Sequence, residues 1–153
     1  MLDEGDMIPA GTLTLSDGTA FALGGRGKPL VVYFYPKADT PGCTNEAKDF
    51  SALAADFAAI GVDVVGVSKD SVAKLAKFSA KYDLKVLLAS DADSQVIEDF
   101  GVWIEKAMYG RTYMGIERAT FLFDKDGRLV RQWHKVKVKG HAAEVLAAAR
   151  ALG

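Results

Sequence analysis

Cysteine is the scarcest reactive residue in this chain of 153 residues, which contains only Cys43. A single cysteine excludes a disulfide framework within the chain and a Cys-x-x-Cys dithiol motif. The formal net charge is −1, so the basic excess that is typical of nucleic-acid binders is missing. No apolar run approaches the ~20 residues of a membrane-spanning helix, and residues 1–6 are acidic and lack the apolar segment of a secretory signal. We therefore expect a cytoplasmic protein without a nucleic-acid or membrane partner.

Apolar residues, by contrast, make up 50% of the chain. A chain of this length and composition can bury a substantial core as one domain over residues 1–153. Strand-like and helix-like patterns alternate along most of it, which predicts an α/β layered domain with a central sheet flanked by helices.

The expected elements follow from periodicity and turn residues. Alternation on both sides of Asp17-Gly18 predicts a β-hairpin over residues 12–23, and a second hairpin turns at Asp126-Gly127. The further strands are expected at 30–35, 62–68, 86–89, 119–123 and 128–138, and the helices at about 41–60, 71–82, 91–100 and 140–152. Residues 102–116 have no steady periodicity and are expected to form a surface loop, and the Gly-rich residues 24–29 a plain turn.

Cys43 lies where a buried strand is expected to end and a helix to begin. Pro41 suits the first turn of a helix, where its missing N–H would have no partner, and Gly42 allows the backbone to approach a ligand closely. Free N–H groups and the positive end of the helix dipole favour a thiolate over a thiol. A lone cysteine is nevertheless often an inert small hydrophobe, so the residues alone leave both interpretations open.

Other polar residues offer weaker candidates. His134 and His141 lack metal-ligand spacing to each other or to an acidic cluster and are expected to be surface or capping residues. Asp91 and Asp93 fit helix capping better than a calcium loop. Lys135, Lys137 and Lys139 alternate with valines and are expected to line a solvated strand edge that discourages sheet-to-sheet pairing. No metal and no cofactor is expected.

Pro36, Thr40 and Cys43 match the Pro-x-x-x-Thr/Ser-x-x-Cys motif, and residues 117–122, Glu-Arg-Ala-Thr-Phe-Leu, follow far downstream. With these motifs the chain resembles the peroxiredoxins, in particular the bacterioferritin comigratory protein (peroxiredoxin Q) branch, from about Gly5 to the last helix. The resemblance implies a thioredoxin-like fold with an N-terminal hairpin extension. It also implies that the strand after Glu117 supplies an active-site arginine, Arg118.

The resemblance implies a role for each matching residue in reducing hydrogen peroxide and organic hydroperoxides. Cys43 would attack one peroxide oxygen, and the Arg118 fork would donate to the sulfur and the peroxide. The Thr40 hydroxyl would contact the sulfur and the bound peroxide, and the backbone N–H groups of Cys43 and Gly42 would hold the distal oxygen. Pro36 would shape the pocket and limit solvent access, without a chemical step.

The chain departs from the family at Lys48, which stands where many members of this branch carry a resolving cysteine. A sulfenic acid at Cys43 therefore cannot close to a disulfide within the chain. An external thiol has to reduce it, with thioredoxin, glutaredoxin, glutathione and another small thiol all open. A redox relay that passes oxidation to a partner, and a thioredoxin-fold binding module with an inert cysteine, remain alternatives to the peroxidase. A monomer is favoured, and a dimer stays open.

Overall fold

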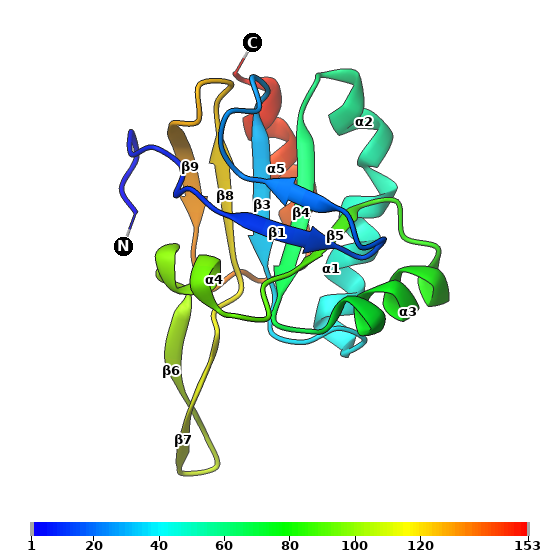
Figure 1. Ribbon diagram of the computed structural model, residues 1–153, viewed down its shortest axis with the longest axis vertical. Helices are drawn as coiled ribbons and strands as arrows, with labels where there is room; N and C mark the ends of the chain where they lie inside the picture. The colour runs from blue at the N-terminus through cyan, green and yellow to red at the C-terminus, as the bar shows by residue number, and fades with distance from the viewer. Residues whose placement is uncertain (1, 153) are drawn as a thin grey trace.

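A computed structural model describes residues 2–152 (Figure 1). The elements are, in chain order, β1 Thr12–Leu15, β2 Ala20–Ala22, β3 Leu30–Phe34, α1 Pro41–Ala52, α2 Ala54–Ala59, β4 Asp63–Ser68, α3 Val72–Tyr82, β5 Leu87–Ser90, α4 Gln95–Asp99, β6 Trp103–Met108, β7 Arg111–Ile116, β8 Ala119–Phe123, β9 Leu129–Trp133 and α5 His141–Arg150. None of the helices among residues 2–152 combines the length and apolar character needed to cross a bilayer.

Seven strands form one mixed sheet in the order β2-β1-β5-β4-β3-β8-β9. The central strands β3, β4 and β5 run parallel, because a helix connects each to the next, whereas β8 and β9 pair antiparallel at one side. The expected N-terminal hairpin is confirmed, with Leu13 opposite Phe21, and it extends the sheet antiparallel to β5. The predicted thioredoxin-like α/β fold with its N-terminal extension is therefore confirmed.

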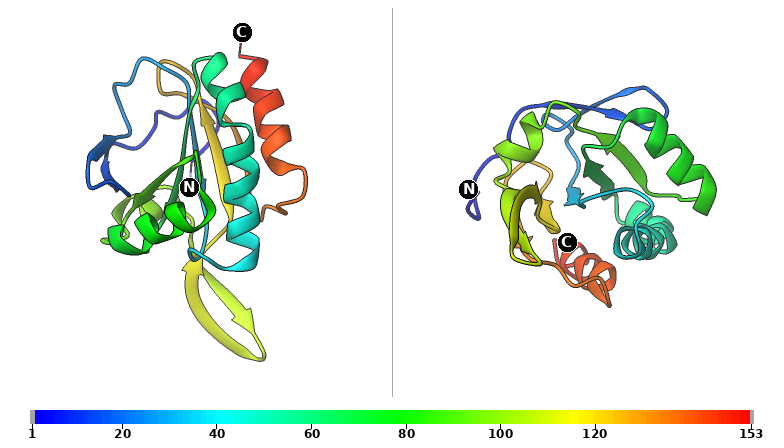
Figure 2. Two further views of the ribbon diagram at one scale, coloured as in Figure 1. Left: turned by 90° about the vertical axis from the view of Figure 1, so that its right-hand side faces the viewer. Right: turned by 90° about the horizontal axis from the view of Figure 1, so that it is seen from below.

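Strand β3 is buried on both faces because helices and loops cover the sheet from both sides. Val32 and Phe34 point into a core that α4 and the N-terminal hairpin close. Val31 and Tyr33 point into a second core under α1, α2, α3 and α5. Figure 2 shows α1 and α5 side by side on one face of the sheet. Burial on this scale stabilises the fold by about 1.5–3 kcal/mol for each large apolar side chain.

The predicted loop over 102–116 is wrong, because these residues form the hairpin β6–β7, a two-stranded sheet apart from the main one. The hairpin projects from the body (Figure 1), and most of its side chains are exposed. Alternation is weak in its sequence because neither face packs fully on a core. Its turn residues Tyr109 and Gly110 both have positive φ, 52° and 77°, as a two-residue hairpin turn requires.

Three further boundaries differ clearly from the sequence prediction. The helix expected over 91–100 begins only at Gln95. The first long helix is interrupted at Leu53 and continues as α2. Strand β9 ends at Trp133 instead of residue 138, and Lys135 has a φ of 48°, which is incompatible with a regular strand. The lysines from Lys135 to Lys139 therefore lie in the irregular connection to α5 and do not line a strand edge.

Gly66 on β4 makes room for the ring of Tyr33 on the neighbouring β3. A Cβ atom at Gly66 would overlap Tyr33 Cζ and lie 2.6 Å from Tyr33 Oη, inside a core without free space. We expect Gly66→Ala to lower the free energy of unfolding by about 1–3 kcal/mol in urea denaturation. Gly24→Ala is the control, since nothing lies within 4 Å of its Cβ position, and it should change stability by less than about 0.5 kcal/mol. Equal effects of the two variants would contradict this packing role.

Candidate active site

Cys43 is the third residue of α1 and lies one short loop beyond the carboxyl end of β3. Thr40 has the extended backbone of an N-cap residue, with φ −95° and ψ 156°, and Pro41 occupies the first turn. The predicted position of Cys43 at a strand-to-helix junction is therefore confirmed. Its side chain is only 2% exposed and packs within the core under α1.

Arg118 reaches this cysteine from the start of the strand that pairs with β3. It immediately precedes β8, and the antiparallel register sets Ala119 opposite Phe34, the last residue of β3. Arg118 Nη2 donates to Cys43 Sγ at 3.4 Å, although the two residues are 75 positions apart. The Arg118 carbonyl accepts from the Val136 N–H at 2.9 Å, which fixes the backbone at this point. A fixed positive charge thus lies against the sulfur.

Gly42 provides the space that this contact needs. A Cβ atom on Gly42 would lie 3.2 Å from Arg118 Nη2 and 3.8 Å from its Cζ. The absence of a side chain therefore lets the guanidinium approach the first turn of α1. The sequence prediction attributed Gly42 to close approach of a ligand, whereas the described neighbour is this arginine.

Glu46 is a site residue that the sequence analysis missed. It lies one turn after Cys43, is 1% exposed, and its Oε1 accepts from Arg118 Nη1 at 2.8 Å. Burial raises the pKa of Glu46 to about 7, against the opposing effect of Arg118. The spacing of three residues, which puts Cys43 and Glu46 on one helix face, is the signal that identifies it.

The Arg118 guanidinium is thus held between a carboxyl group and a sulfur atom. One fork nitrogen binds Glu46 and the other binds Cys43. The guanidinium is largely buried, and Glu46 and Cys43 together raise the pKa of Arg118 although burial itself opposes its charge. An arginine that cannot lose its proton and cannot rotate freely suits the stabilisation of negative charge at one fixed point.

Thr40 and Pro36 lie next to this group without a described contact to the sulfur. Thr40 Oγ1 donates to the Lys37 carbonyl at 2.7 Å, which closes the loop before α1. Pro36 is exposed and lies two residues beyond the end of β3. Lys48 is exposed on α1, with its Nζ 4.9 Å from the centre of the Tyr82 ring. The functional roles expected for Thr40 and Pro36 stay predictions.

His141 was expected at the surface or at a helix end, and the surface alternative is wrong. It is the first residue of α5, but its side chain is buried and its Nε2 lies 2.8 Å from Thr120 Oγ1. Burial lowers the pKa of His141 to about 4, so the ring is neutral near pH 7. His134 is exposed and its Nδ1 lies 2.8 Å from Glu117 Oε2. Among residues 2–152, no three His, Cys, Asp or Glu side chains gather as a metal site would require.

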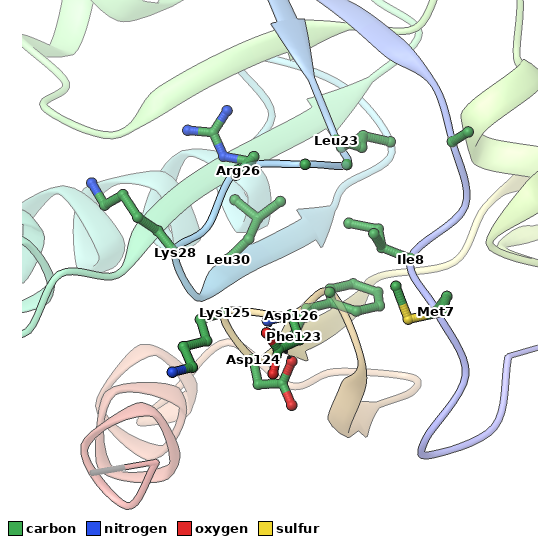
Figure 3. Close-up of a pocket in the computed structure, with 14 residues that line it drawn as sticks. Met7, Ile8, Leu23, Arg26, Lys28, Leu30, Phe123, Asp124, Lys125 and Asp126 are labelled. Atoms are coloured by element: carbon green, nitrogen blue, oxygen red, sulfur yellow. Dashed lines mark hydrogen bonds between the residues drawn. The ribbon is translucent and has the colours of Figure 1, made fainter.

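A hollow of about 160 Å³ lies at the far end of β3 from Cys43 (Figure 3). Leu30, the first residue of β3, lines it together with Ile8, Leu23 and Phe123. Because Cys43 follows the last residue of the same strand, this hollow does not belong to the site around the sulfur.

Substituting Gly42 should disturb the arginine more than the helix. Gly42→Ala favours helix formation by propensity, but its Cβ displaces the guanidinium from the sulfur. We expect the rate of Cys43 alkylation by iodoacetamide at pH 7 to fall about three- to ten-fold, because the guanidinium no longer donates to the sulfur. In an Arg118→Ala background the same substitution should have no further effect. Additive losses in the double variant would contradict the proposed displacement.

Glu46 should make stability depend on pH in a defined direction. Its pKa is raised from 4.5 to about 7 on folding, so its contribution is complete below pH 4.5 and is lost as the pH rises through 7. We expect the free energy of unfolding of the wild type to fall relative to Glu46→Gln between pH 5 and 8, by on the order of 1–3 kcal/mol. Asn45→Gln, a change of an exposed residue without charge on the same helix, should show no such trend. A pH-independent difference for Glu46→Gln would exclude the raised pKa.

Comparison with known proteins gives a consistent result. The family model described as AhpC/TSA family matches residues 5–132. The chain is 51% identical to peroxiredoxin Bcp of Bacillus subtilis over 79% of this chain and 77% of that protein. It is 48% identical to peroxiredoxin Bcp of Xanthomonas campestris, over 94% of this chain and 93% of the relative.

Solved structures agree with the sequence relatives. A structure from work on alkyl peroxide reduction by the bacterioferritin comigratory protein of Xanthomonas campestris superimposes with a TM-score of 0.85 and 47% identity, covering 92% of this chain and 90% of that one. A cysteine-to-serine mutant of PrxQ from Xylella fastidiosa superimposes with a TM-score of 0.92 and 39% identity, over 99% and 97% of the two chains. The chain therefore belongs to the AhpC/TSA family, within which it is a peroxiredoxin of the Bcp, or PrxQ, kind.

Proposed function

We propose that this peroxiredoxin reduces hydrogen peroxide and organic hydroperoxides through a Cys43 sulfenic acid, with Arg118, Thr40, Gly42 and Pro36 forming the rest of its site. The activity follows from the family, and the relative from Xanthomonas campestris is described with alkyl peroxide reduction activity. Residues 1–153 act as a single domain and as a monomer in the cytoplasm.

The first step is attack of the Cys43 thiolate on one peroxide oxygen. A sulfur–oxygen bond forms as the O–O bond breaks, and the electron pair leaves on the second oxygen, which takes up a proton to become water or an alcohol. Arg118 donates to the sulfur before attack and stabilises the charge that grows on the departing oxygen. Glu46 acts as a positioning residue that keeps the guanidinium in place.

The remaining residues orient the peroxide. Thr40 presents a hydroxyl one turn before the sulfur, and the N–H groups of Gly42 and Cys43 at the start of α1 have no partner within the helix. These groups can hold the distal oxygen as an oxyanion site does. Pro36 lacks an N–H and ends the strand ahead of the reactive loop.

The contact of Arg118 Nη2 with Cys43 Sγ at 3.4 Å carries the proposal. Glu46 already pairs with this buried guanidinium, so a binding module with an inert cysteine would not need the second contact to the sulfur. A thiolate that reacts with a peroxide uses this charge both before attack and in the transition state.

The second half of the cycle requires an external thiol, because Cys43 is the only cysteine of the chain. The sulfur of the reductant attacks Cys43, the sulfur–oxygen bond breaks, and the oxygen leaves as water after protonation. A second thiol then resolves the mixed disulfide and returns Cys43 to the reduced state. Thioredoxin, glutaredoxin and glutathione are the candidate reductants.

Stopped-flow mixing of the reduced protein with one equivalent of hydrogen peroxide, followed by Trp103 and Trp133 fluorescence, tests the assignment. The wild type should react orders of magnitude faster than free cysteine. Cys43→Ser should abolish the reaction, and Arg118→Ala should slow it by about 100-fold, as for loss of one oxyanion donor.

Arg128→Ala is the matched control, because this exposed arginine lies on the connection between β8 and β9 and donates to the Gly5 carbonyl at 3.1 Å. Its rate should equal that of the wild type. A wild-type rate no greater than that of free cysteine would refute the peroxidase assignment and favour the binding module.

A further inference from the structure

The loop that precedes Cys43 is fixed to α3 through Asp39. This residue has a left-handed backbone, with φ 60°, and both of its carboxylate oxygens are occupied. Oδ1 accepts from the Tyr82 hydroxyl at 2.6 Å, and Oδ2 pairs with Lys81 Nζ at 2.8 Å. Lys81 and Tyr82 are the last two residues of α3. An unfavourable loop conformation is therefore held by two specific contacts.

The helix that carries Cys43 is attached to the same tyrosine. Lys48 Nζ lies 4.9 Å from the centre of the Tyr82 ring, within the range of a cation–π contact. Asp39 lies four residues before Cys43, and Lys48 lies five residues after it. Both segments that flank the reactive sulfur thus meet at one side chain. We call Asp39, Lys48, Lys81 and Tyr82 the Tyr82 cluster.

Tyr82 is well placed to hold these segments, because its ring is itself supported from the core. It packs edge-on against Phe78 with ring centres 5.7 Å apart, and the Phe78 ring centre lies 6.4 Å from that of Tyr35, which follows β3. The loop has another attachment at the neighbouring strand end, where the Ala38 N–H donates to Asp70 Oδ2 at 2.8 Å.

The charges of the cluster persist near neutral pH. The hydrogen bond from Lys81, with that from Tyr82, holds the pKa of Asp39 below its ordinary value. The hydrogen bond to Asp39 in turn raises the pKa of Lys81. The pair therefore stays ionised around pH 7.

We propose that Tyr82 is a positioning residue for the reaction of Cys43. Through Asp39 and Lys48 it holds the turn that carries the thiol against the end of α3, which is the closed state of the turn. It thereby limits how often the oxidised sulfur becomes accessible to a protein thiol. This inference rests on the proposed function and adds a residue that regulates its second step, the reduction of the oxidised sulfur by an external thiol. Lys48, at the position where many related chains carry a resolving cysteine, contributes to this closure instead of to a disulfide.

The two half-reactions make opposite demands on this turn. Peroxide is small and reacts with Cys43 in the closed turn, beside Arg118. A reducing thiol on a protein must bring its sulfur in line with the sulfur–oxygen bond of a residue that is 2% exposed in the closed turn. A protein thiol can approach only when the turn opens, whereas a small thiol needs less opening of the turn. The rate of reduction by a protein therefore follows the open fraction, and the rate of peroxide reduction follows the closed fraction.

Tyr82→Phe removes the hydroxyl bond to Asp39 and leaves the ring under Lys48. Loss of one partly exposed hydrogen bond should raise the open fraction about five-fold. Amide hydrogen exchange of residues 38–47 in the reduced protein should accelerate by the same factor. Reduction of the Cys43 sulfenic acid by thioredoxin should also rise about five-fold, and that by 2-mercaptoethanol less, while the peroxide step stays within about two-fold of the wild type.

Tyr109→Phe is the control, because it makes the same chemical change on the exposed hairpin turn. Lys48→Met should act in the same direction as Tyr82→Phe. Unchanged exchange in Tyr82→Phe, or peroxide reduction and thioredoxin reduction slowing together, would overturn the role of Tyr82. The exchange measurement needs no peroxide, so a wild type that consumes no peroxide would overturn the proposed function separately.

Discussion

The antiparallel pairing of β3 with β8 is the constraint on which the site depends. Its register sets Phe34 opposite Ala119, so the loop after β3 and the residue before β8 emerge at the same edge of the sheet. Cys43 follows the first strand and Arg118 precedes the second. A register shift of one residue would reverse the side chains of β8 between the two cores and remove the guanidinium from the sulfur.

The site places charged groups where burial makes them costly. Glu46 is almost fully buried, and Arg118 lies mostly out of solvent between this carboxyl group and Cys43. The buried charge of Arg118 is acceptable because Glu46 and Cys43 accept its hydrogen bonds, since an unpaired charge in a medium of low polarity costs several kcal/mol. The same low polarity would strengthen the proposed action of Arg118 on a departing oxygen. The low polarity of the site is therefore the reason both for the proposed strength of Arg118 as a catalytic group and for its need of a paired carboxyl group.

The segment around Cys43 is held from two directions. Arg118 contacts the sulfur and is itself held by Glu46, whereas Tyr82 contacts the side chains of Asp39 before the sulfur and of Lys48 after it. A chain without a second cysteine gains no disulfide from opening this segment. A lysine at position 48 that favours the closed turn is consistent with a cycle in which the reductant comes from outside.

Local sequence determined the elements whose signals are short-range. The hairpin at Asp17-Gly18, the buried strand 30–34, the helix start at Pro41 and the position of Cys43 follow from turn chemistry, periodicity and capping. The motif residues also indicated Arg118 through resemblance to a family. Tertiary structure alone decided that Glu46 is buried beneath Arg118, that Gly42 makes room for its guanidinium, and that Asp39 and Lys48 meet at Tyr82. These contacts join residues up to 75 positions apart, and only the strand register and helix packing set such distances.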